Sequence, residues 1–242
     1  QPWSFSWDLP PLAGRMLASA GWSFFAVSLM ALRRPTYRRL RLIVILLFVY
    51  LAPLTLIIAL YHLDRFDFGE PITYGFFAIV IPMLLASTRY LLRQPHIIPE
   101  ASHDMVPTNT VLKVWLSVVA VITILWGLAL LVTDSGPSSL IWAWPGDLLS
   151  SRLIGVMLVT IAVGSLYSLR YADTARLMLM MIVVYSLGIT IASLWNLLFG
   201  LPIKTLYISV FSVICLVTAV LLRSDRQPRH VLRRSTNNQP IT

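Results

Sequence analysis

The sequence predicts an all-α polytopic integral membrane protein with seven transmembrane helices in a 3+1+3 arrangement of two parallel internal repeats. Three observations lead to this prediction: an apolar composition, seven long apolar runs, and a similarity between the two halves of the chain. Apolar residues make up 57% of the 242 residues and charged residues 12%, against roughly 25% charged in soluble domains. The mean hydropathy of +0.78 indicates a chain whose main solvent is lipid.

The first three apolar runs cover residues 12–32, 40–61 and 72–92. Each is close to the length of about 20 residues that a helix needs to cross the hydrocarbon of a bilayer. Hydrocarbon offers no partner to an unpaired backbone N–H or C=O group, so these runs are expected to be helical. The first run follows Trp3 and Asp8 without a basic leader, which argues against a cleavable signal peptide.

The remaining four runs cover residues 111–132, 153–169, 175–198 and 205–222. The run at 111–132 has no counterpart in the internal similarity and is expected to connect the two halves. The run at 153–169 is the shortest of the four. The segment 223–242 is basic and then polar, so a cytoplasmic tail in contact with lipid headgroups is expected there.

The internal similarity emerges when residues 7–42 are shifted by 137 positions onto residues 144–179, which gives 10 identities in 36 without a gap. The first members of the identical pairs are Trp7, Leu12, Arg15, Ser28, Leu29, Leu32, Arg33, Arg39, Leu40 and Leu42. Leucine pairs arise easily between apolar helices, but a matched tryptophan and three matched arginines do not. We therefore predict one membrane domain (1–242), with repeat 1 at about 7–94, a connecting helix at about 111–132 and repeat 2 at about 144–222.

Basic residues are distributed unevenly over the predicted loops. One side of the membrane carries 15 of the 19 Lys and Arg residues, and the positive-inside rule assigns that side to the cytoplasm. The prediction is a multi-pass protein of a bacterial-type plasma membrane with its N-terminus outside and its C-terminus in the cytoplasm. This topology and the attraction of anionic headgroups explain the net charge of +9, so no nucleic-acid partner is expected.

The 3+1+3 plan with an outside N-terminus resembles the topology of the SWEET sugar transporters, whose repeats are related by an axis along the membrane normal. That family carries matched prolines in its repeat helices. Here the shift of 137 positions places Pro53 opposite Thr190 and Pro82 opposite Ala219. The resemblance therefore covers topology alone and transfers no site residue to this chain.

Each repeat opens with a tryptophan and an arginine at matched positions, Trp7 with Arg15 and Trp144 with Arg152. Indole rings favour the level of the headgroups, and a long arginine side chain can extend to a phosphate while its stem stays in an apolar environment. These four residues are predicted to be interfacial anchors.

Inside the spans, Asn196 beside Trp195 is the most polar feature of the sequence. It could line a substrate path, or it could form a hydrogen bond between helices. By the predicted boundaries, every Asp, Glu, Lys, Arg and His side chain lies at a helix end or in a loop. The spans thus lack the buried charges that mark proton relays and ion sites.

The predicted outer loop after the second run is rich in potential ligands, with His62, Asp64, Asp67 and Glu70 close together. Their spacing matches no metal-binding signature, so we predict no metal site there. A contact with a basic patch of a partner protein is the functional alternative to a solvated loop. The sequence identifies no cofactor.

Two function classes follow from these features. The first is a non-catalytic accessory or scaffold subunit of a larger membrane complex, since the spans are apolar and the loops carry no catalytic motif. Membrane lipid and other membrane protein subunits would be its partners. The second is a facilitative transporter of a small neutral solute, since parallel repeats can enclose a path at their interface. An enzyme is the third and weakest class, because no nucleophile and base can be paired.

Overall fold

The computed structural model describes residues 10–93, 106–133, 148–201, 203 and 205–224. In these segments the chain forms seven helices that are long and apolar enough to span a membrane. They are α1 (Pro11–Leu32), α2 (Tyr37–Ile57), α3 (Pro71–Arg93), α4 (Thr110–Val132), α5 (Leu148–Tyr167), α6 (Ala172–Leu198) and α7 (Thr205–Ser224). The chain is therefore an all-α polytopic membrane protein. The described residues contain no strand, and their one isolated bridge joins Pro107 to Tyr171.

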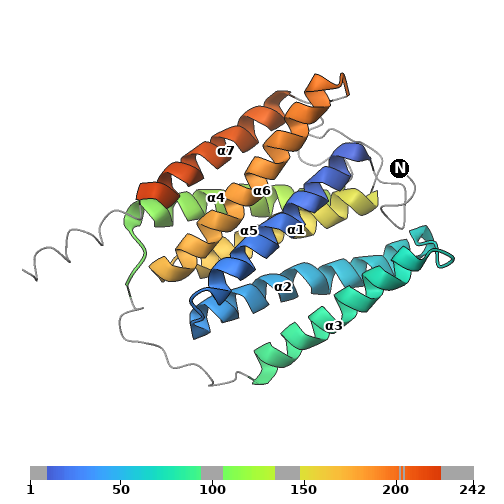
Figure 1. Ribbon diagram of the computed structural model, residues 1–242, viewed down its shortest axis with the longest axis horizontal. Helices are drawn as coiled ribbons and strands as arrows, with labels where there is room; N and C mark the ends of the chain where they lie inside the picture. Colours follow the sequence, from blue (N-terminus) through green and yellow to red (C-terminus); the bar gives the residue numbers. More distant parts are fainter. Residues whose placement is uncertain (1–9, 94–105, 134–147, 202, 204, 225–242) are drawn as a thin grey trace, which may run out of the picture.

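Consecutive helices run in opposite directions, so the molecule has two ends (Figure 1). The Arg15 end contains the first turns of α1 and α5 and the last turns of α2 and α6. The Arg39 end contains the first turns of α2, α4 and α6, and it is the end predicted to be cytoplasmic. At the Arg15 end, α2 continues into a π-helical turn, η1 (Ile58–His62), and a short 3₁₀ helix, η2 (Leu63–Arg65).

Local sequence signals set several helix ends. Pro11 occupies the first position of α1, where a missing backbone N–H costs no hydrogen bond. Thr36 caps α2, because its Oγ1 accepts a hydrogen bond from the backbone N–H of Arg39 at 3.3 Å. The chain leaves α6 through Gly200, whose φ of 65° lies in the left-handed region that glycine adopts without strain.

Three helices begin a few residues before the predicted runs. α2 begins at Tyr37 rather than at 40, α5 at Leu148 rather than at 153, and α6 at Ala172 rather than at 175. At the start of α5, the polar side chains of Ser150, Ser151 and Arg152 lower the local hydropathy, so the apolar run begins later than the helix. The two serines are nevertheless fully buried against neighbouring helices, so the hydropathy of this stretch does not report its environment.

The helices pack in a pattern that crosses between the two halves of the sequence. α1 packs along α6, and α2 packs along α5, whereas α1 with α2 and α5 with α6 make smaller contacts. α3 packs chiefly on α2, and α7 packs on α6, at opposite edges of the view in Figure 1. α4 covers α5. As a result α5 is buried along most of its length, while most of α3 is exposed.

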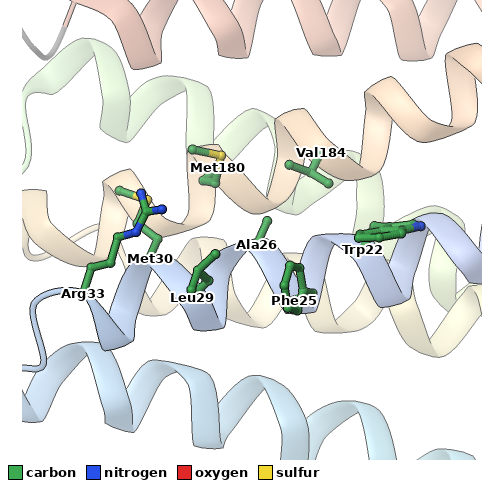
Figure 2. A pocket seen from close by; sticks show the side chains of 8 residues that line it. All are labelled: Trp22, Phe25, Ala26, Leu29, Met30, Arg33, Met180 and Val184. Carbon is green, nitrogen blue, oxygen red and sulfur yellow. The ribbon is translucent and has the colours of Figure 1, made fainter.

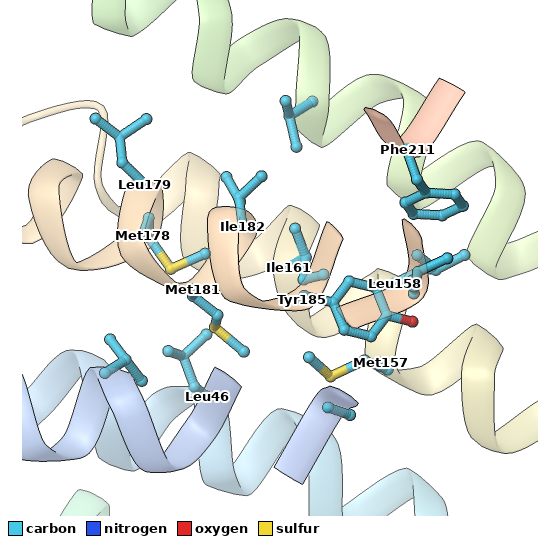
Figure 3. Packing of buried hydrophobic residues seen from close by; sticks show 14 of the residues in the cluster. Leu46, Met157, Leu158, Ile161, Met178, Leu179, Met181, Ile182, Tyr185 and Phe211 are labelled. Atoms are coloured by element: carbon cyan, nitrogen blue, oxygen red, sulfur yellow. The ribbon is translucent and has the colours of Figure 1, made fainter. Parts of the chain in front are cut away.

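In the described segments, one apolar core joins six of the helices and leaves out α3. At its centre, Leu46 of α2, Met157 of α5 and Met178 of α6 are each fully buried and converge from different helices (Figure 3). We call this contact region between α1–α2 and α5–α6 the seam. A Cβ atom added to Gly164 of α5 would lie 2.6 Å from Leu46 Cδ2 and 2.7 Å from Met178 Sδ, so the seam is filled by side chains at that level.

Candidate functional site

Arg15, one of the predicted anchors, joins α1 to the last turns of α6. Its Nη1 donates a hydrogen bond to Oδ1 of Asn196, which is only 3% exposed. Its Cζ lies 5.8 Å from the centroid of the Trp195 ring, within the range of a cation–π contact. The structure thus gives the Arg15 guanidinium two partners on another helix, and both are residues that the sequence singled out as the intramembrane polar pair.

Arg152, the matched anchor of the second half, joins α5 to the end of α2. Its Nη1 lies 2.8 Å from Nε2 of His62, and its Cζ lies 5.0 Å from the centroid of the Tyr61 ring. Arginine can only donate, so Nε2 must accept and this imidazole nitrogen carries no proton. His62 is 6% exposed and therefore faces the helices rather than the solvent of a loop.

The two arginines make the same kind of contact. Arg15 reaches from the first half of the chain to the second, and Arg152 reaches from the second half to the first. Each sits in the first turns of its helix and reaches an aromatic residue followed directly by a polar acceptor, Tyr61-His62 or Trp195-Asn196. We call these two contacts the arginine clamps. Tyr61 was not among the predicted site residues. Its signal in the sequence was the recurrence of an aromatic residue followed by a polar acceptor at the end of the second helix of each half.

A third polar contact lies at the Arg39 end. Nε of Arg39 donates to both carboxylate oxygens of Asp173, at 2.7 and 2.6 Å, and Nη2 also contacts this carboxylate. Thr36 Oγ1 lies 3.4 Å from the same carboxylate. The Arg39 and Asp173 side chains are 12% and 16% exposed, so water screens this ion pair weakly. The pair ties the start of α2 to the start of α6.

Asp173 was not among the predicted site residues. Its signal in the sequence is weak, because one acid in the first turn of a helix is favoured by the helix dipole alone. Next to it, the guanidinium of Arg38 stacks on the ring of Tyr171, with 3.7 Å between Cζ and the ring centroid. Two adjacent arginines of α2 are thus held by two residues at the start of α6.

The predicted cluster of His62, Asp64, Asp67 and Glu70 is divided by the structure. His62 is buried and contacts α5, whereas the three acids are exposed. Oδ1 of Asp67 accepts a hydrogen bond from the backbone N–H of Gly69 at 2.7 Å and so stabilises the local turn. In the described part of the chain, no three His, Cys, Asp or Glu residues are grouped so as to hold a metal ion.

Two predicted anchors, Trp7 and Trp144, lie outside the described residues. Of the other predicted site residues, Arg15, Arg152, His62, Trp195 and Asn196 take part in contacts between helices, Asp67 stabilises a local turn, and Asp64 and Glu70 are exposed. Cys215 is a free thiol whose Sγ lies 3.9 Å from the carbonyl oxygen of Val183.

Chemically, the arrangement holds helices together. The arginine, histidine and aspartate side chains of the clamps and of the ion pair each contact a protein group on another helix. Comparison of the chain with protein-family models, with curated proteins and with solved structures finds no match, so its function is argued from these contacts.

Proposed function

We propose that this chain is a non-catalytic accessory or scaffold subunit of a larger membrane protein complex. The observation that carries the proposal is the use of its polar side chains. Arg15, Arg39 and Arg152 each bind an acceptor on a helix from the other half of the chain. Groups that in a carrier or an enzyme would face a substrate here serve helix packing.

The filled seam supports the same proposal. A carrier needs space between its moving halves, whereas Leu46 and Met178 are fully buried and both reach Gly164 of α5 at the centre of this seam. Gly188 of α6 approaches Ser19 of α1 so closely that an added Cβ would lie 2.4 Å from the serine Oγ. Small residues at such contacts allow transmembrane helices to pack at short distance. Packing of this kind favours a rigid body.

The proposal includes the topology and the origin of the fold. We infer that the Arg39 end is cytoplasmic, because the basic residues gather there. We also infer that the two halves arose by duplication into parallel repeats. Support comes from the reciprocal arginine clamps and from the equivalent packing of α1 on α6 and α2 on α5.

Other membrane subunits are the proposed partners. α3 is the helix with the least buried surface, and the exposed acids Asp64, Asp67 and Glu70 precede it at the Arg15 end. An acidic loop next to an exposed apolar helix suits a partner whose own helix lies along α3 and whose loop is basic. This is the surface that we assign to the complex.

A facilitative carrier of a small neutral solute is the second candidate. Reciprocal packing of parallel repeats about an axis along the membrane normal is the arrangement in which carriers place their path. In that case the clamps of Arg15 and Arg152 would have to open at one end of the seam during each transport cycle.

The test is isolation of the affinity-tagged chain from its native membrane in a mild detergent, followed by sizing and mass spectrometry of what co-migrates. We expect a particle larger than the chain with one or more membrane proteins in fixed ratio to it. Neutralising Asp64, Asp67 and Glu70 together should lower that ratio, and the matched change Arg65→Gln in the same loop should not. A monodisperse particle of this chain alone, with solute uptake after reconstitution into liposomes, would instead establish the carrier.

A further inference from the structure

A groove of about 500 Å³ runs along the outer side of the contact between α1 and α6 (Figure 2). One wall is a stripe of α1 side chains at positions 22, 25, 26, 29, 30 and 33, the spacing of residues on one helix face. Met180 and Val184 of α6 form the other wall. The groove is apolar along its length and has a single cation, Arg33, at the Arg39 end.

The length of the groove matches one leaflet of a bilayer. Trp22 and Arg33 are eleven positions apart on α1, which corresponds to roughly 16 Å along the helix axis at 1.5 Å per residue. The hydrocarbon of one leaflet is about 15 Å thick, half of the bilayer core. An acyl chain lying in the groove would therefore place its headgroup near Arg33.

Arg33 is available for such a contact. It is the C-cap residue of α1 and is exposed, as is its neighbour Arg34. Within the described segments, the carboxylate of Asp173 at this end is bound by Arg39, and no acid forms an ion pair with Arg33. A phosphate would supply the missing negative charge, since arginine binds phosphate oxygens through its forked donors.

The matched surface of α5 in the second half of the sequence indicates why a flexible acyl chain fits this groove better than another protein helix does. On α5, the positions matched to Ala18 and Trp22 are Gly155 and Val159, and α4 packs directly on them through Gly127. On α1, Trp22 is 65% exposed, and its ring forms an edge-to-face pair with that of Phe25, with centroids 5.8 Å apart. Two projecting rings keep another helix from approaching as α4 does, but they can line an acyl chain.

We propose that this groove binds one anionic glycerophospholipid from the leaflet at the Arg39 end, with an acyl chain along α1 and the phosphate on Arg33. The site stands independently of the proposed scaffold function, because it requires only that α1 and α6 lie in a membrane. It would add a bound lipid to the surface of the chain and fill the space beside Ala26 and Met30.

The test uses the delipidated full chain in mild detergent, titrated with phosphatidylglycerol or with phosphatidylcholine of the same acyl chains and read by native mass spectrometry. We expect one saturable site that prefers phosphatidylglycerol. Arg33→Gln should weaken phosphatidylglycerol binding about fivefold, the effect of one arginine near an anionic surface, and leave phosphatidylcholine binding nearly unchanged. The matched control is Arg93→Gln, which removes an exposed arginine from the last turn of α3 and should not weaken binding.

Two further variants test the groove itself. Ala26→Trp should fill it and abolish saturable binding of both lipids, while Val121→Trp on the exposed face of α4 should not. Because Ala26→Trp could disturb packing, the paired change Trp22→Ala and Phe25→Ala serves as the second probe. It removes only exposed rings and should lower the affinity for both lipids. Wild-type elution on size exclusion establishes that each variant is folded.

Several results would overturn the proposal. An equal loss of phosphatidylglycerol affinity in Arg33→Gln and Arg93→Gln would show that overall charge, rather than the position of Arg33, determines binding. Lipid binding that persists in both groove variants would place the lipid elsewhere. Competition by glycerophosphate as strong as that by the intact lipid would show a phosphate site that needs no acyl chain. A dimer of this chain that excludes lipid and is broken by Ala26→Trp would identify a second copy as the occupant.

Discussion

The contact between α4 and α5 depends on two glycines that face each other. A Cβ atom added to Gly127 of α4 would lie 2.8 Å from the carbonyl oxygen of Gly155 and 3.1 Å from the backbone nitrogen of Val159. Ordinary contacts of a Cβ atom begin near 3.4 Å. A third close atom is Val159 Cγ2 at 2.9 Å, but the other two belong to the backbone, so rotation of a side chain cannot relieve the overlap. Gly127→Ala therefore requires α4 and α5 to move apart by about 0.6 Å, which loosens the packing on both helices.

The expected magnitude follows from this overlap. Inserting a methyl group into a close-packed contact typically lowers the free energy of unfolding by about 1–3 kcal/mol. Alanine also gains about 0.5–1 kcal/mol over glycine within a helix. Gly21→Ala measures that gain alone, because nothing lies within 4 Å of a Cβ atom added to Gly21 of α1. We predict that Gly127→Ala is less stable than Gly21→Ala by about 1–3 kcal/mol.

The assay is reversible unfolding in mixed micelles with increasing dodecyl sulfate, followed by circular dichroism and tryptophan fluorescence. Gly155→Ala should cost as much as Gly127→Ala, and the double variant should cost less than the sum, because either change alone separates the helices. Gly127→Ala as stable as Gly21→Ala would refute the close approach of α4 and α5.

Three further predictions concern contacts between the halves. Arg39→Gln and Asp173→Asn should each lower the free energy of unfolding by about 1.5–3 kcal/mol. A double-mutant cycle should show strong coupling between the two changes, whereas additive losses would mean that the pair does not form. Asn196→Leu should lower the unfolding temperature, because the Arg15 guanidinium loses its acceptor. Adding Arg15→Leu to that variant should restore part of the lost unfolding temperature, and a further drop would contradict the clamp. Gly164→Ala should cost less than Gly127→Ala in the same micelle assay, since it meets the flexible ends of side chains, and the reverse order would count against that reasoning.

The number and type of the elements could be predicted from the sequence because bilayer thickness sets the length of an apolar run. The start of α5 could not, because Ser150, Ser151 and Arg152 lower the hydropathy of a segment whose serines are buried by protein. Hydropathy predicts burial in lipid, whereas burial among helices also admits hydroxyl groups. The helix that looked shortest in the sequence is thus the most enclosed in the structure.

The candidate site could be predicted in part. Arg15 and Arg152 were selected by their matched positions, and Asn196 by its polarity at depth. Their pairing could not be derived, because it depends on α1 lying along α6 and α2 along α5, which neither periodicity nor spacing determines. Asp173 escaped selection for the same reason: its partner, Arg39, is distant in sequence and adjacent only in the fold.

Water access to the seam tests the proposed static scaffold most directly. In a Cys215→Ser background, a single cysteine is introduced as Met157→Cys at the seam, as Leu125→Cys on the exposed face of α4, or as Asp64→Cys in the exposed loop. A water-soluble thiol reagent is then applied to the chain in liposomes. A filled seam predicts that Met157→Cys reacts no faster than Leu125→Cys. Modification of Met157→Cys at a rate near that of Asp64→Cys would reveal a hydrated path and contradict the scaffold.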